Sequence, residues 1–228
     1  MNIIYCYSTK NGKKIWSYKT ENFFIKSNKK LSIVFDNEKI IFNNSIGDIT
    51  ALDANKGFLI WQTPTQNNQI YAETISLRAS SLVVDNNFIL FSNNKNEFYS
   101  LDKNDGFINW KQTINSDTKP LVSGELIFSV SNEGLLFIID LKNGNIIKTQ
   151  DLFTNYSDKK RISVKPIGIS SGVNKIFITL SNGRLLVVDL KTGNIIKNIK
   201  IDSQTISPPY IFNKKVYIIK NNSIIELS

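Results

Sequence analysis

A short sequence pattern occurs five times in this chain, and this repetition limits its fold more than any other feature. In each copy an alternating apolar run reaches an Asp or Ser, a Gly follows four residues later, and a second apolar run begins. The copies are CYSTKNGKKIW (6–16), ALDANKGFLIW (51–61), SLDKNDGFINW (100–110), IDLKNGNIIK (139–148) and VDLKTGNIIK (188–197). Their glycines are 45, 49, 38 and 49 residues apart. A period near this length is typical of a β-propeller in which each repeat forms one four-stranded blade.

Each copy also has the residues of a tight turn between two strands. The Asp side chain can accept backbone N–H bonds within the turn, and the Gly supplies the positive φ that the turn needs. We therefore assign a structural role to the turn residues, which are Gly12, Asp53, Gly57, Asp102, Gly106, Asp140, Gly144, Asp189 and Gly193. Large aromatic side chains end three copies, and we expect them to pack between neighbouring blades rather than to stack on a ligand. They are Trp16, Trp61 and Trp110, and their place is taken by Lys148 and Lys197 in the last two copies.

A second hairpin lies upstream of the pattern in each complete unit, as in Leu82–Asp85 with Phe88–Ser92. No window of the chain has a convincing helical period. The sequence therefore predicts an all-β fold, a β-propeller of four-stranded blades, as one domain or fragment over residues 1–228. The expected units are a partial blade at 1–20, blades at about 31–63, 80–113, 118–151 and 162–200, and a partial blade at 205–228.

The first and last of these units are predicted to lack strands. Ile3–Ser8 and Lys13–Lys19 correspond to the third and fourth strands of a blade, and the last unit reaches only its third strand, Ser223–Leu227. Four full blades and two partial ones predict an incomplete ring. Such a ring would leave Ile224 and Ile225 on an unpaired edge and would favour association in solution.

Composition excludes several classes of function. The chain has no histidine and one cysteine, so it has no His-dependent triad, no internal disulfide and no thiolate metal cage. Its net charge is +9, but only three of its 28 basic residues are arginines, and we expect no specific nucleic-acid binding. The apolar runs are too short to span a bilayer. The residues before Cys6 do not resemble a signal peptide or a lipoprotein cleavage site.

The pattern A-x-D-x-x-x-G-x-x-x-W, clearest at 51–61, resembles the quinoprotein repeat of pyrroloquinoline quinone (PQQ) enzymes and their non-catalytic relatives. Between the repeats, TISLRA (74–79) is similar to the S-L-S-L-R-G loop of the BamB family, the propeller lipoproteins of the outer-membrane β-barrel assembly complex. NSDTKP (115–120) is similar to that family's D-V-D-T-T-P loop, with Asn115 in place of the first Asp. The resemblance runs along the whole chain and corresponds to the C-terminal portion of an eight-bladed fold.

In that family the two loops contact the barrel-bearing partner, BamA. The resemblance therefore implies a partner-binding site at Ile75, Leu77, Arg78 and Asp117. From the residues alone, Ile75 and Leu77 are equally explained as core-facing positions of an alternating strand, with Arg78 reaching solvent. The resemblance also implies a non-catalytic scaffold at the periplasmic face of the outer membrane, held there by the lipid anchor of a full-length parent.

Two other functions fit a quinoprotein repeat: a fragment of a PQQ-dependent oxidoreductase, and a generic propeller that binds another protein or a glycan. A PQQ dehydrogenase needs a cationic pocket, a Ca²⁺ held by oxygen ligands and a catalytic Asp. The repeat Asp residues are separated by whole blades and do not converge, and the chain has no Cys pair. We therefore expect no enzymatic activity, no cofactor and no metal.

One basic run stands outside the repeats. Lys159, Lys160 and Arg161 lie between two units, near Asp151 and Asp158. We expect this run to form a solvated loop face, and contact with an anionic lipid or a partner is the alternative.

Overall fold

The computed structural model of the protein describes residues 3–20, 31–44, 47–65 and 78–227. Within these residues the sheets are antiparallel meanders, and the regular structure is strand apart from one short helix, α1 (Asp158–Ser163). The chain forms two compact units, Met1–Thr113 and Ile114–Ser228.

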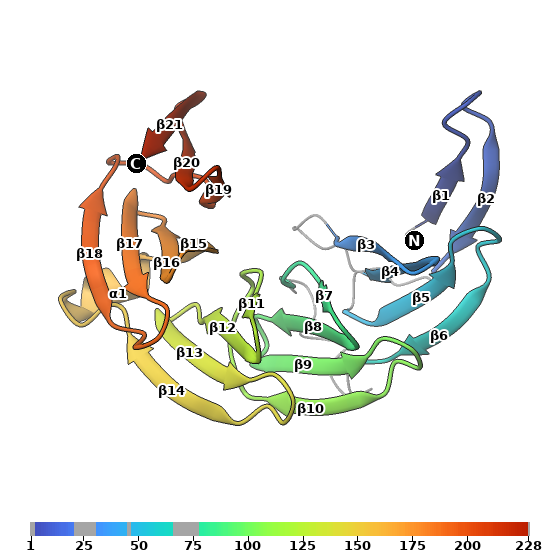
Figure 1. Ribbon diagram of the computed structural model, residues 1–228, viewed down its shortest axis with the longest axis horizontal. Helices are drawn as coiled ribbons and strands as arrows, with labels where there is room; N and C mark the ends of the chain where they lie inside the picture. Colours follow the sequence, from blue (N-terminus) through green and yellow to red (C-terminus); the bar gives the residue numbers. More distant parts are fainter. Residues whose placement is uncertain (1–2, 21–30, 45–46, 66–77, 228) are drawn as a thin grey trace. The chain divides into compact units, whose positions relative to one another are not determined.

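The first unit contains one two-stranded sheet and two four-stranded sheets, in which neighbouring strands follow the order of the sequence (Figure 1). The two-stranded sheet pairs β1 (Ile3–Tyr7) with β2 (Lys14–Lys19). The next sheet consists of β3 (Ile33–Asp36), β4 (Lys39–Asn43), β5 (Ile49–Asp53) and β6 (Leu59–Thr63). The third consists of β7 (Val83–Asp85), β8 (Phe88–Asn93), β9 (Glu97–Asp102) and β10 (Ile108–Gln112).

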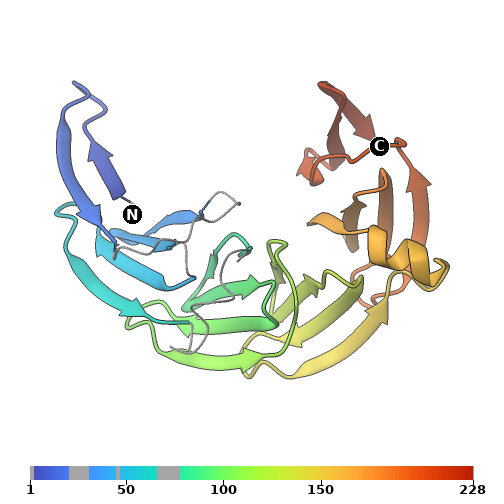
Figure 2. The ribbon, with the colours of Figure 1, turned by 180° about the vertical axis from the view of Figure 1, so that it is seen from behind.

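The second unit contains two four-stranded sheets and one three-stranded sheet, again in sequence order (Figure 2). The first consists of β11 (Leu121–Ser123), β12 (Leu126–Val130), β13 (Leu135–Asp140) and β14 (Ile146–Asp151). The second consists of β15 (Pro166–Gly172), β16 (Lys175–Leu180), β17 (Arg184–Asp189) and β18 (Ile195–Lys200). The third consists of β19 (Tyr210–Phe212), β20 (Lys215–Lys220) and β21 (Ser223–Leu227).

These sheets are the four complete and two partial propeller blades that the repeat predicts. The strand ranges also lie close to the expected ones. The predicted hairpin Leu82–Asp85 with Phe88–Ser92, for example, is observed as β7 and β8.

The all-β fold contains one short helix among the described residues, α1. This helix has six residues and buries none of them. A helix of fewer than two turns is too short to show an amphipathic period, and this explains why the sequence did not indicate it. No helix among the described residues combines the length and the apolar character that crossing a membrane requires.

The inner strands of the blades are buried on both faces, and this explains their sequences. In β8 every residue after Phe88 is buried, and in β17 the four residues between Arg184 and Asp189 are buried. A strand that is covered on both sides reads as a continuous apolar run rather than as an alternation. Residues of the preceding blade cover one face of β8, and residues of the preceding blade likewise pack against β17.

The hydrophobic cores therefore lie between neighbouring sheets. In the first unit, one cluster joins side chains of β4, β5 and β6 to side chains of β8 and β9. In the second unit, one cluster joins β12 and β13 to β16 and β17, and another joins the β15–β18 blade to the three-stranded sheet. Face-to-face packing of successive four-stranded sheets is the arrangement of propeller blades.

The Asp–Gly turns have the same geometry in each blade. Oδ1 of Asp53 accepts the backbone N–H groups of Asn55 (3.0 Å) and Lys56 (2.6 Å). The Gly57 N–H donates to the Asp53 carbonyl at 2.8 Å, and Gly57 has a φ of 72°. The register of the third and fourth strands shifts next to each turn, at Ala51/Leu52 in this blade. The carboxylate thus holds the turn, and glycine tolerates its left-handed backbone.

The tryptophans Trp16 and Trp61 each cover the turn of the next blade. A Cβ placed on Gly57 would lie 2.6 Å from the Trp16 ring, and Trp16 Nε1 donates to the Ala54 carbonyl at 2.9 Å. A Cβ placed on Gly106 would lie 2.5 Å from the Trp61 ring. These two rings therefore pack between blades, where glycine leaves room for the indole.

Lys148 fills the same place in the second unit without an aromatic ring. Its Cδ and Cε would lie 3.8 and 3.9 Å from a Cβ on Gly193. Its ammonium donates to the Thr192 carbonyl, and to Oδ1 of Asn194 at 3.2 Å. Ile138, whose Cδ1 would lie 3.1 Å from the same Cβ, covers the glycine together with the aliphatic stem of Lys148. The charged end of the lysine bonds the turn, as the indole N–H does in the first unit.

Asp202 precedes the last blade, and its environment predicts a pH dependence of stability. The backbone N–H of Gln204, Lys220 and the N–H of Ser203 lower the pKa of Asp202 from 3.8 to about 2. A carboxyl whose pKa is lower in the folded state stabilises above its unfolded pKa and loses this contribution as the pH falls from 3.8 towards 2. We expect Asp202→Asn to flatten the dependence of the unfolding free energy on pH in this window, measured by urea titration.

The control for this prediction is Lys220→Met. The backbone N–H of Gln204 is the largest single cause of the pKa shift and does not involve Lys220, so this variant should keep part of the pH dependence. Equal slopes for Asp202→Asn and the unsubstituted protein would contradict the assignment.

Candidate partner-binding site

Arg78 lies immediately before the third blade, and its backbone is held on the β8–β9 hairpin. Its N–H donates to Oδ1 of Asn94 at 2.8 Å, and its carbonyl accepts the Asn94 N–H at 3.0 Å. The next residue, Ala79, forms an isolated bridge with Asn93. The Arg78 side chain is exposed. These hydrogen bonds therefore fix the position of the Arg78 backbone at the end of the β8–β9 hairpin.

Thr65, on the other side of 66–77, is held as well. Its N–H donates to Oδ1 of Asp48 at 3.1 Å, and its carbonyl accepts the Tyr99 hydroxyl at 2.9 Å. Burial is the main cause that raises the pKa of Tyr99 to about 12, so the hydroxyl keeps its proton and remains a donor over the physiological pH range. Thr65 and Arg78, the described residues on either side of 66–77, are therefore both held by hydrogen bonds to residues of the blades.

Asp117 lies in the segment that leads into β11, and two hydroxyls hold this segment on the second strand of its blade. Ser116 Oγ and Thr118 Oγ1 both donate to the Val130 carbonyl, at 2.7 and 3.1 Å. Ser116 and Thr118 are buried, and Asp117 between them is half-buried. Asn115, the position that departs from the family's loop, donates to Oε1 of Glu133 at 2.5 Å.

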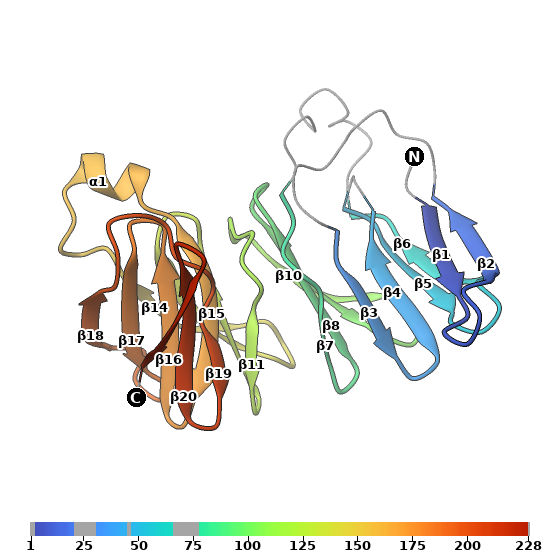
Figure 3. The same cartoon turned by 90° about the horizontal axis from the view of Figure 1, so that it is seen from above.

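Backbone hydrogen bonds hold the segments that lead into two other blades on the second strand of those blades. The N–H of Ser80 donates to the Ser92 carbonyl at 2.8 Å, and the N–H of Ser207 donates to the Ile219 carbonyl at 3.0 Å. Each such segment is therefore attached to the end of the second strand. Because the strands of a blade alternate in direction, this is the end opposite to the Asp–Gly turns. In the second unit α1 lies at this end of the strands (Figure 3).

Of the four predicted partner-binding residues, the structure describes two. Ile75 and Leu77 lie outside the described residues. Arg78 belongs to the first unit and Asp117 to the second, and each lies at the second-strand end of its own blade. The anchoring residues Asn94 and Val130 were not among the predicted site residues. The run Ser92-Asn93-Asn94 after an apolar strand was the available signal, since Asn often bonds the backbone near turns.

The basic run after β14 is partly engaged in the fold. Arg161 forms an ion pair with Asp151 at 2.8 Å and donates to the Phe153 carbonyl at 2.9 Å. Lys160 lies over the Tyr156 ring, 5.1 Å from its centroid, and Lys159 is exposed. The expectation of a fully solvated run is therefore wrong for Arg161, whose guanidinium ties α1 to the end of β14.

Acidic and cysteine side chains form no cluster in the part of the chain that the structure describes. No group of three or more Asp, Glu or Cys side chains among the described residues is placed to hold a metal ion. The repeat carboxylates bond the backbone of their own turns, as Asp189 does with the N–H groups of Lys191 (3.1 Å) and Thr192 (2.7 Å). These bonds, chiefly to Thr192, lower the pKa of Asp189.

Comparison with protein families gives a match over most of the chain. Residues 2–150 match the model of a family described as outer membrane protein assembly factor BamB. Among curated proteins, no sequence matches this chain.

Solved structures share the architecture. The crystal structure of BamB from Moraxella catarrhalis has a TM-score of 0.76 and 14% identity, covering 98% of this chain and 66% of its own. The β-propeller domain of Cps50 (Swd1) from Myceliophteria thermophila has a TM-score of 0.61 and 12% identity, covering 82% of this chain and 60% of its own. The computationally designed Ika4 protein has a TM-score of 0.53 and 10% identity, covering 65% of this chain and 89% of its own. Identities this low show the fold alone, and the chain spans just under two thirds of the BamB structure it matches.

Proposed function

Because this chain belongs to the family of outer membrane protein assembly factor BamB, we propose that it is a non-catalytic scaffold in outer-membrane β-barrel assembly, binding a BamA-type partner through inter-blade segments. The contact residues in this proposal are Ile75, Leu77, Arg78 and Asp117. The site of action is the periplasmic face of the outer membrane, within the full-length parent.

One observation carries the proposal. The family match over residues 2–150 includes both segments that resemble the partner-contacting loops, 74–79 and 115–120. A match confined to the Asp–Gly turns would indicate the blade architecture and nothing about the segments between blades.

The hydrogen bonds that hold Arg78 and the residues around Asp117 support the same role. Arg78 is fixed by two backbone hydrogen bonds to Asn94 while its side chain is exposed. The segment around Asp117 is fixed through the Val130 carbonyl. A binding segment held in place before it meets its partner loses less conformational entropy on binding. Loops positioned by a rigid scaffold are also where binding residues concentrate.

We test the proposal with the triple variant Ile75→Ala, Leu77→Ala and Arg78→Ala. If these residues anchor the partner, each truncation removes about 2 kcal/mol or more, so even one of them weakens binding about 30-fold. We expect the triple variant to lose capture of the purified periplasmic domains of the partner in a titration by biolayer interferometry. Asp117→Ala should give a smaller loss, because that side chain is half-buried.

The matched control is the double variant Phe58→Ala and Phe107→Ala. These exposed side chains follow the Asp–Gly turns, at the opposite end of their blades, and their loss should leave partner affinity unchanged. Circular dichroism and the unfolding midpoint separate binding from folding. A triple variant that is folded and binds normally rules out this contact site, and one that unfolds assigns Ile75 and Leu77 to the core.

A further inference from the structure

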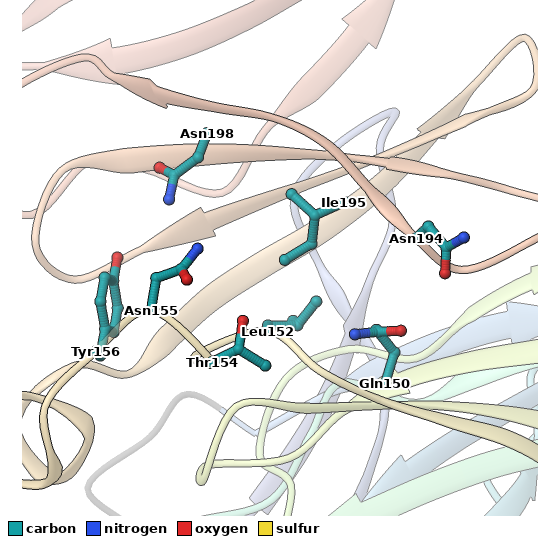
Figure 4. A pocket seen from close by; sticks show the side chains of 8 residues that line it. All are labelled: Gln150, Leu152, Thr154, Asn155, Tyr156, Asn194, Ile195 and Asn198. Atoms are coloured by element: carbon teal, nitrogen blue, oxygen red, sulfur yellow. The ribbon is translucent and has the colours of Figure 1, made fainter.

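A small pocket opens beside the linker that follows β14. It has a volume of about 360 Å³ and lies between β14, β18 and the linker (Figure 4). Its lining is neutral and rich in side-chain amides, and it consists of Gln150, Leu152, Thr154, Asn155, Tyr156, Asn194, Ile195 and Asn198. Protein ligand pockets begin at about this volume, so the space suits a compact ligand.

Three polar groups of the lining already accept a hydrogen bond, and their donors remain available. Lys148 Nζ donates to Oδ1 of Asn194 at 3.2 Å, and Arg184 Nη1 donates to Oδ1 of Asn198 at 2.9 Å. Asn182 Nδ2 donates to the Tyr156 hydroxyl oxygen at 3.2 Å. The amide N–H groups of Asn194 and Asn198 and the O–H of Tyr156 donate to no other group in the described part of the chain, so they are available as donors to a ligand.

Other lining groups can both donate and accept. The side chains of Thr154 and Asn155 make no hydrogen bond within the described part of the chain. Gln150 uses its Nε2 on the Asp151 carbonyl at 3.1 Å, which leaves its Oε1 as an acceptor. A hydroxyl-rich ligand matches this mixture, because each hydroxyl also donates and accepts.

Two aliphatic side chains divide the polar groups. Leu152, which is 4% exposed, and Ile195 lie in the middle of the pocket. Figure 4 shows Tyr156, Asn155 and Asn198 at one end and Gln150 and Asn194 at the other. A ligand that fits therefore carries one small apolar group among polar ones.

We propose that this pocket binds an N-acetylated amino-sugar unit of a glycan. The acetamido methyl packs on Leu152 and Ile195, its carbonyl accepts from the amide and hydroxyl donors, and the ring hydroxyls bond the remaining carboxamides. No charged side chain lines the pocket, and the nearby cations Lys148 and Arg184 already bond protein oxygens. A neutral ligand is favoured over an anion for that reason, since an anion would meet no charged partner in the lining.

The test is a calorimetric titration of the protein with the trimer of N-acetylglucosamine. We expect a saturable isotherm, and at least about tenfold weaker binding of the glucose trimer, which lacks the acetamido group. In a spectrum of ¹⁵N-labelled protein, the side-chain amide signals of Asn155, Asn194 and Asn198 should shift with the acetylated sugar. No saturable binding of the acetylated trimer overturns the proposal, and so does equal affinity for the two sugars.

Two variants localise the site. Asn155→Leu removes a side chain that has no hydrogen bond within the described residues, so it should weaken binding about tenfold without a change in the unfolding midpoint. Asn198→Leu should weaken binding similarly. The control Asn109→Leu changes an exposed asparagine of β10, outside the pocket, and should bind normally. Unchanged affinity for the acetylated sugar in a folded Asn155→Leu protein overturns the assignment. The proposal is also overturned if an extended peptide shifts the side-chain amide signals of Asn155, Asn194 and Asn198 and neither sugar does.

Discussion

Gly106→Ala is expected to destabilise the protein by about 3 kcal/mol, although it adds one methyl group. The left-handed backbone of Gly106, with a φ of 78°, costs an alanine about 1–2 kcal/mol. The new Cβ would also lie 2.5 Å from the Trp61 ring and 2.7 Å from Thr63 Oγ1, and overpacking of this kind costs about 1–3 kcal/mol. Urea unfolding followed by circular dichroism measures the difference.

Gly12→Ala is the matched control. Gly12 has the same position in the repeat and a similar φ of 67°, but a Cβ there would meet nothing within 4 Å. Its substitution should therefore cost only the backbone contribution, about 1 kcal/mol. Equal losses for the two variants would contradict the conclusion that Trp61 packs against the turn of the next blade.

The second large effect is expected for Phe153→Ala, at about 3–5 kcal/mol. Phe153 is fully buried in the cluster between the two four-stranded blades of the second unit, although it lies in a linker. Its ring covers Gly134, and the Tyr156 ring lies 5.3 Å away between centroids. Removing it leaves a cavity in the core, which urea unfolding will report as a lower midpoint.

Phe107→Ala is the control for this variant, because Phe107 is 74% exposed. Its truncation should change the unfolding free energy by less than about 0.5 kcal/mol. If the two phenylalanines prove equally important, the placement of the linker in the core is wrong.

The blades and their turns could be predicted because they depend on interactions within each repeat. Asp53 and Gly57 are four residues apart, and the hydrogen bonds that close their turn involve only residues near them. The apolar runs of strands such as β8 follow from burial on both faces. Interactions this short in sequence leave a readable pattern in the order of the residues.

The candidate partner site could be predicted only in part. Arg78 and Asp117 were identified through resemblance. The bond from Arg78 to Asn94 joins residues 16 positions apart, and the bonds from Ser116 and Thr118 to Val130 join residues 14 and 12 positions apart. Apart from Asn93 and Asn94, no local pattern marks these bonds. Ile75 and Leu77 stay predictions, and the triple variant tests them together with Arg78.

The sequence by itself determined the number, order and strand composition of the blades, because local turn chemistry and burial of inner strands are encoded within each repeat. Only the tertiary structure decided which of two phenylalanines is core. Phe107 follows the turn glycine Gly106 and Phe153 follows Leu152 at the start of a linker, but only Phe153 is enclosed by the neighbouring strands. It also decided that Lys148 replaces an indole over Gly193, and that Asn155 and Asn198 line one pocket. These outcomes depend on contacts between blades, and such contacts join residues about 40 or more positions apart, as the Lys148–Thr192 bond does.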